Sequence, residues 1–141
     1  MAPEVQAAIL GLFGAVVGGL LVVLGAVVTR RDELRQAQRV ALRLAAADVV
    51  ATYLHARGRL KGQMNTGAVL PEADLFPPER WLALARLFTL PGSEQLRDQV
   101  LELGAATLAV IEAKDRSKAE QGFERQLTAI RAFEASVRRA A

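Results

Sequence analysis

The chain has 141 residues, of which 52% are hydrophobic, and a formal net charge of +3 at pH 7. That length allows one compact domain with at most one extra element, and so small a charge is weak support for nucleic-acid binding. Cysteine is absent, which excludes disulfides, thiolate metal sites and cysteine nucleophiles. The abundance of alanine and arginine, against few lysines, indicates a GC-rich bacterial genome.

The N-terminal segment contains an uncharged run of 23 residues, Ala7 to Thr29, in which every residue but Thr29 is apolar or glycine. A helix of that length spans roughly 34 Å, slightly more than a hydrocarbon core of about 30 Å. A buried core helix would normally show a polar side and stop sooner. A cleaved signal peptide would carry a basic residue near Met1 and a small-x-small cleavage site. The run therefore predicts a single transmembrane helix, with the lipid bilayer as its first partner.

The flanks of this run are asymmetric in charge. No lysine or arginine precedes it, whereas four arginines follow it closely: Arg30, Arg31, Arg35 and Arg39. The positive-inside rule then places the N-terminus outside and the C-terminal part in the cytoplasm. The sequence thus predicts a single-pass protein of the bacterial inner membrane.

Small residues recur on one narrow face of the same run: Ala7, Gly11, Gly14, Gly18 and Gly25. Gly14 and Gly18 form a GxxxG, and such faces let two membrane helices approach closely. The alternative is that glycine is simply common in membrane helices. We expect this face to mediate self-association or contact with another membrane helix. The absence of charge within the run argues against a proton relay or ion path.

The residues after Thr29 favour helix, since Ala, Leu, Arg and Gln predominate and proline is absent from Val5 to Leu70. We therefore predict one continuous helix from about Val5 to at least Arg57. Its expected buried stripe follows helical spacing and comprises Leu34, Ala37, Ala41, Leu44, Ala51 and Leu54. Asp48 interrupts this stripe, and a buried carboxylate would need an arginine partner from another helix.

The rest of the chain predicts three more helices, at about 78–88, 94–115 and 118–139, after a loop at 65–77. In the first of them Trp81, Leu84, Ala85 and Phe88 should face inward, and prolines open it. Ser117 and Glu120 have the spacing of a capping box at the start of the last helix. The predicted fold is therefore all-α: an N-terminal anchor (1–29) continuing into a small antiparallel cytoplasmic helical bundle (30–141).

No set of residues predicts catalysis, a metal site or a cofactor site. His55 is the only histidine and lacks the spaced partners of a metal site, and no phosphate-binding loop follows the glycines. We therefore expect no enzyme activity, no cofactor and no nucleic-acid partner.

The arginine ladder Arg31, Arg35, Arg39 and Arg43 repels itself and should meet acidic groups. Near the bilayer, Arg31 and Arg35 should reach lipid head groups. Arg39 and Arg43 lie further along the helix and should meet acids of the bundle such as Glu112, Glu120 or Glu124. The sequence thus predicts contact with head groups or an acidic partner for Arg30, Arg31, Arg35 and Arg39.

Two functions fit this organisation. The first is a non-enzymatic, membrane-tethered interaction or scaffold protein that binds an unknown protein at the cytoplasmic face of the inner membrane. The alternative is a small accessory subunit or homo-oligomer of a transport, secretion or pore-forming membrane assembly, joined through the glycine face.

Overall fold

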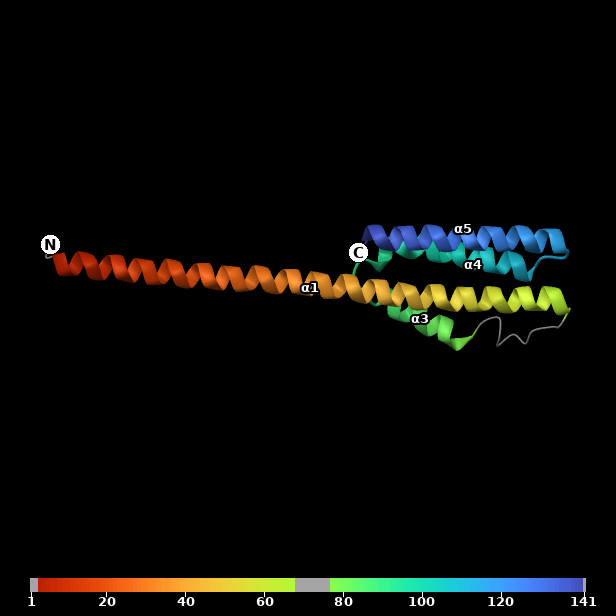
Figure 1. Ribbon diagram of the computed structural model, residues 1–141, viewed down its shortest axis with the longest axis horizontal. Coiled ribbons are helices and arrows are strands. Elements are labelled where there is room, and N and C mark those ends of the chain that lie inside the picture. The colour runs from red at the N-terminus through yellow and green to blue at the C-terminus, as the bar shows by residue number, and fades with distance from the viewer. Residues whose placement is uncertain (1–2, 68–76, 141) are drawn as a thin grey trace. The chain divides into compact units, whose positions relative to one another are not determined.

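A computed structural model describes the backbone of residues 3–67 and 77–140 and the side chains of residues 18–67 and 77–140. The elements in chain order are α1 (Pro3–Thr66), α3 (Pro78–Phe88), the 3-10 turn η1 (Ser93–Leu96), α4 (Arg97–Ile111) and α5 (Arg116–Ala140) (Figure 1). The all-α class is confirmed. The single helix expected from about Val5 to at least Arg57 is also confirmed, since α1 covers that range. The chain divides into two compact units, residues 1–37 and 38–141, and α1 contributes to both.

The first unit corrects the membrane prediction. No helix in the described part of the chain is long and apolar enough to cross a bilayer. The single-pass anchor, its N-outside orientation and its inner-membrane location are therefore wrong. In the described part of the uncharged run, residues 18–29, the side chains are exposed. The side chains of Ala7, Gly11 and Gly14 lie outside the described residues.

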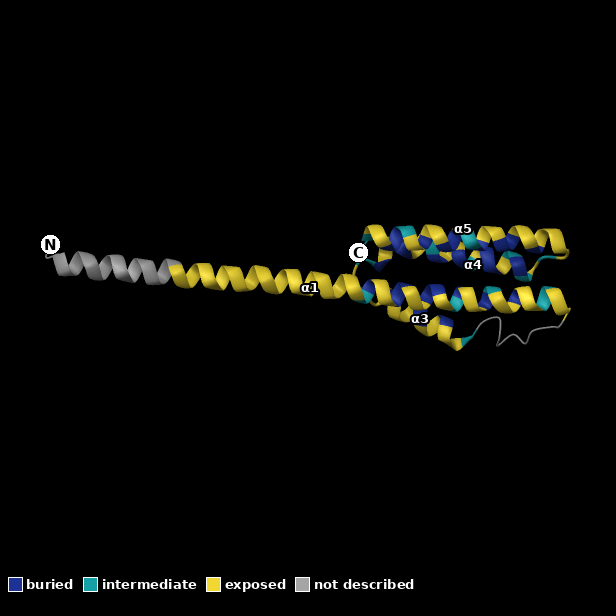
Figure 2. Ribbon diagram, in the orientation of Figure 1, coloured by how far each residue is buried: buried dark blue, intermediate teal, exposed yellow. Residues whose placement is uncertain are grey.

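The second unit is a helical bundle, as expected. Buried side chains of α1, α3, α4 and α5 form one apolar cluster, and Leu87, Leu96, Leu103 and Phe133 within it are completely covered. A smaller cluster of Leu60, Val110 and Phe123 continues the core. Figure 2 shows buried and exposed residues alternating along the part of α1 in this unit, as in a helix covered on one side. Four helical segments thus share one core.

The ends of the shorter helices follow from local chemistry. Pro78 opens α3, where its fixed φ suits the first turn. Gly92 has a φ of 83°, a left-handed conformation that glycine adopts without strain, and it lets the chain turn from α3 into η1. At the start of α5, the backbone N–H of Lys118 donates to Asp115 Oδ1 at 2.8 Å. The capping residue is therefore Asp115, and the capping box expected at Ser117 is wrong by two positions.

Gly122 permits the close packing of α4 and α5. A Cβ atom at this position would lie 2.7 Å from Val110 Cγ2 and 3.2 Å from the Val110 backbone nitrogen. Real Cβ atoms do not approach that closely, so a side chain here would push the two helices apart. The glycine in "EQGFE" therefore fixes the spacing of the C-terminal helix pair.

The structure also corrects which face of α1 is buried. The buried residues in the second unit are Leu42, Ala45, Ala46, Val49, Val50, Tyr53, Ala56 and Leu60. Of the stripe expected to be buried, Ala41 is half-buried and the other members are exposed. Leu42 is 2% exposed, whereas Leu44 is 64% exposed, because two residues correspond to about 200° of rotation around a helix. The sequence holds two apolar faces, and the core uses the other one.

In helix α3, too, the buried face differs from the predicted one. Of the four residues expected to face inward, Trp81, Ala85 and Phe88 are exposed and Leu84 is half-buried. Arg80, Ala83 and Leu87 are buried instead. The guanidinium of Arg80 lies over the ring of Tyr53, 4.7 Å from its centroid. This cation–π contact lets an arginine occupy a core-facing position.

Candidate interaction surface

The polar residues singled out in the sequence do not assemble into a reactive site. His55 and Asp48 are both exposed on α1, so the buried arginine pair expected for Asp48 is wrong. Among the described residues, no group of three or more His, Cys, Asp or Glu side chains could hold a metal ion.

The arginine ladder is exposed along its whole length. Arg35 lies 4.0 Å from Asp32 on its own helix, and Glu120 pairs with Arg116 at 3.1 Å. Within the described residues, neither Arg39 nor Arg43 forms an ion pair with Glu112, Glu120 or Glu124. Contact of Arg30, Arg31, Arg35 and Arg39 with an acidic group outside the chain stays a prediction.

The glycine face is open where it is described. Gly18 and Gly25 are exposed, and a Cβ atom added at either one would meet no atom within 4 Å. Around them the apolar side chains are all more than half exposed: Leu20, Leu21, Val22, Val23, Leu24, Val27 and Val28. Nothing in the described chain covers this segment, and its self-association stays a prediction.

Two buried polar contacts serve the bundle itself. The Gln126 amide donates to Thr107 Oγ1 at 2.8 Å, and the Thr107 hydroxyl donates to the Leu103 carbonyl at 2.8 Å. Burial raises the pKa of the Tyr53 phenol, and the charge of Arg80 opposes that rise. The same burial lowers the pKa of Arg80. These contacts give Gln126 Nε2, the Thr107 hydroxyl and the Arg80 guanidinium partners in the core, whereas the buried Gln126 Oε1 accepts no hydrogen bond from the described residues.

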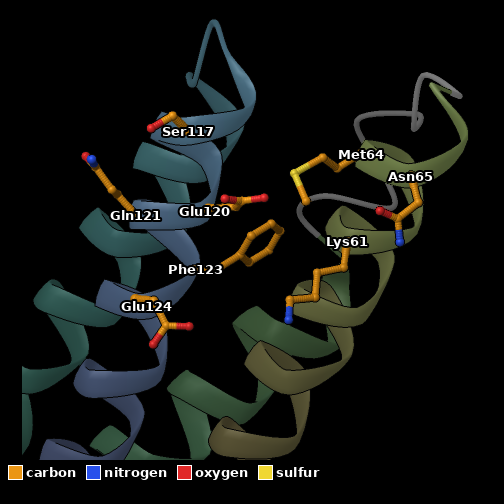
Figure 3. A pocket seen from close by; sticks show the side chains of 8 residues that line it. All are labelled: Lys61, Met64, Asn65, Ser117, Glu120, Gln121, Phe123 and Glu124. Atoms are coloured by element: carbon orange, nitrogen blue, oxygen red, sulfur yellow. The ribbon is translucent and has the colours of Figure 1, made fainter.

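A pocket near the end of α1 is built around Phe123. In Figure 3 this ring extends from α5 toward Lys61 and Met64 of α1, whereas Gln121 points away. Lys61 Nζ lies 5.5 Å and Arg57 Cζ 5.8 Å from the ring centroid, so two cations flank one aromatic ring. Glu120 and Glu124 also line the pocket. These contacts link the end of α1 to α5.

The second unit carries an exposed apolar stripe on α1, opposite the core. We call it the outer stripe, and it comprises Val40, Leu44, Ala47, Ala51 and Leu54, all of them exposed. Val40 is 49% and Leu54 45% exposed, large fractions for side chains of this kind. Contiguous exposed apolar residues of this sort mark interaction surfaces more often than single ones do.

A groove of about 410 Å³ between α1 and α5 continues the outer stripe. Ala47, Ala51 and Leu54 line it from α1, and Phe133 and Val137 line it from α5. Three charged side chains stand at its margin: Arg43, Glu134 and Arg138. An apolar floor with a charged margin is suited to the side chains of another helix.

No family model, no curated protein and no solved structure matches this chain. The candidate surface therefore rests on its own geometry.

Proposed function

We propose that this chain is a non-enzymatic interaction protein whose helical bundle binds another polypeptide through the outer stripe and the adjoining groove. The observation that carries the proposal is the second apolar face of α1. A helix that needs only one apolar face to join its bundle carries a second one on the opposite side. Burying an apolar face away from water is favourable, and an exposed face does not obtain that free energy. A partner that covers the face would supply it.

Two further observations support a binding role. The groove beside the outer stripe has an apolar floor, formed by side chains from two helices of the same bundle. In the first unit, the segment from Leu20 to Val28 is a second uncovered apolar surface. The accessory-subunit alternative depended on a membrane span, and no contact of the described residues favours it.

Site-specific photo-cross-linking in the native cell tests the proposal. A photoreactive residue at Ala51, in the outer stripe, should give protein adducts. The same residue at Gln121, which is exposed on α5 and points away from α1, should give few. Leu44→Lys should abolish the adducts at Ala51, because a charge would then enter the apolar contact. Equal labelling at Ala51 and Gln121 would contradict the proposal.

A further inference from the structure

The spacing of the outer stripe is that of a coiled-coil seam. From Val40 to Leu54 its members are separated by four, three, four and three residues. These are the d, a, d, a and d positions of two heptads, the pattern with which one helix packs against another along a shared axis. Ala47 and Ala51 at the middle of the seam are small, which allows two backbones to approach closely.

The residues beside this seam carry opposite charges on its two sides. Arg43 directly precedes Leu44 and occupies a g position, whereas Asp48 directly follows Ala47 and occupies an e position. Both are exposed, and neither forms an ion pair with any described residue of the chain. The two lie on opposite sides of the seam, so they cannot pair with each other along the helix. They are complementary to a second helix of the same sequence.

The charges also select an orientation. In a parallel pair of helices, each g residue faces the e residue five positions later on the other helix. That rule sets Arg43 of one copy against Asp48 of the other, and two-fold symmetry repeats the contact. An antiparallel pair sets g against g, where the available residues are Arg43, Val50 and Arg57. That arrangement gives Arg43 no acid, so the parallel one is favoured.

We infer that the outer stripe is the contact face of a parallel, two-fold symmetric dimer of this chain, with Arg43 of each copy paired to Asp48 of the other. The inference rests on the proposed function and names its partner as a second copy. The groove between α1 and α5 adjoins the seam, since Ala47, Ala51 and Leu54 belong to both. Side chains of the second α1 would lie over that groove and extend the covered area beyond the seam.

Sedimentation equilibrium of the purified full chain tests the pairing through charge reversal. Arg43→Glu and Asp48→Arg should each weaken the dimer on the order of tenfold, because two attractive contacts become repulsive. The double variant Arg43→Glu/Asp48→Arg restores opposite charges across the seam and should recover the wild-type affinity. Arg131→Glu, an exposed reversal on α5, is the matched control and should leave the dimer unchanged. A monomeric wild-type chain, or a dimer insensitive to both single reversals, would overturn the inference.

Cysteine cross-linking tests the orientation, which the absence of native cysteine makes simple. Oxidation of Leu54→Cys should join two copies of the variant, because equivalent residues of a parallel seam face each other. If instead the Val40→Cys and Ala51→Cys variants cross-link only when mixed, a d position faces an a position, the helices are antiparallel and the inference fails.

The outcomes also separate this inference from the proposed function. A purified chain that is monomeric, while Ala51 still cross-links to a different protein in the cell, refutes the dimer and keeps the interaction role. Absence of both refutes both.

Discussion

The two faces of α1 within the second unit have the same chemistry and opposite surroundings. Leu42 and Leu44 are both leucines, two residues apart, and only Leu42 is covered by the bundle. Ala46 is buried and Ala47 is exposed. Apolar character therefore does not determine which face joins the core. The partner helices α4 and α5 decide it, because their buried side chains must pack against one face and leave the other open.

Truncating the two leucines gives the largest contrast between these faces. Leu42→Ala should lower the free energy of unfolding by roughly 2–5 kcal/mol, because it leaves a cavity in the core. Leu44→Ala should change the stability of the monomer by no more than about 0.5 kcal/mol. Any larger loss in Leu44→Ala should grow with protein concentration, since it would come from association. Chemical denaturation at two protein concentrations measures both effects. Similar losses in both variants at low concentration would show that the two faces are not distinct.

Adding a methyl group at two glycines compares a tightly packed position with an open one. Gly122→Ala should destabilise the bundle by about 1–3 kcal/mol, because the new methyl group would meet Val110. Gly62→Ala, on an open side of α1 with no atom near the added Cβ, should instead be neutral or stabilise by up to about 1 kcal/mol. Thermal unfolding of the two variants checks the signs. A stabilising Gly122→Ala would mean that α4 and α5 do not approach closely there.

Periodicity in the sequence was enough to predict the helices and part of the core. Helical spacing in the segment 94–114 predicts a buried side that comprises Leu96, Val100, Leu103, Thr107, Val110 and Ile111. All of them are buried except Ile111, which is half-buried. The same spacing in the last helix predicts Phe123, Leu127, Ile130, Phe133 and Val137, and all are buried except Leu127, which is half-buried. Helix α5 has one apolar face, so spacing alone identifies the side that packs. Helix α4 also exposes Leu101 and Leu108, but its predicted side is the one that is buried.

The errors fall where a helix has more than one apolar face. In α1 the alanine-rich sequence offers two stripes, and spacing cannot choose between them. In α3 the buried position of Arg80 depends on the ring of Tyr53, a contact between residues far apart in the chain. The same ambiguity hid the candidate surface. Leu44, Ala51 and Leu54 of the outer stripe were predicted to be part of an apolar stripe, but that stripe was assigned to the core. Val40 and Ala47 were not identified, and Arg43 was identified only as part of a charged ladder.

Substitutions of two threonines, one on α4 and one on α5, compare the loss of a buried hydroxyl group with the loss of an exposed one. Thr107→Val leaves the buried Gln126 amide without its partner, and we expect a loss of about 1–3 kcal/mol. Thr128→Val removes an exposed hydroxyl that donates to the Glu124 carbonyl, and we expect almost no change. The double variant Thr107→Val/Gln126→Met should recover part of the loss, because both partners are then apolar. Urea denaturation of the four proteins provides the test, and a Thr107→Val protein as stable as wild type would refute the role of this hydrogen bond.

The smallest effect concerns the ionisation of Tyr53, the only tyrosine of the chain, on the buried face of α1. Burial disfavours the phenolate, so the folded pKa lies above the usual 10.0, and the charge of Arg80 offsets part of the rise. Ultraviolet absorbance of the phenolate should therefore show a midpoint above 10.0 in the folded chain and near 10.0 in urea. Arg80→Met should move the folded midpoint further up, because it removes the nearby positive charge.

The sign of the resulting pH dependence follows from the proton balance. Since the folded chain holds the phenolic proton more tightly than the unfolded chain, this contribution to stability is fully present below pH 10. It is lost as the pH rises through the folded pKa. Lysine side chains titrate in the same range, so the difference between wild type and Tyr53→Phe isolates the phenol. The stability of wild type should fall more steeply above pH 10 than that of Tyr53→Phe. If the stability curves of wild type and Tyr53→Phe run parallel above pH 10, or if the folded midpoint is at or below 10.0, the Tyr53 hydroxyl is exposed to water. The face of α1 that carries Tyr53 would then not be buried at this position.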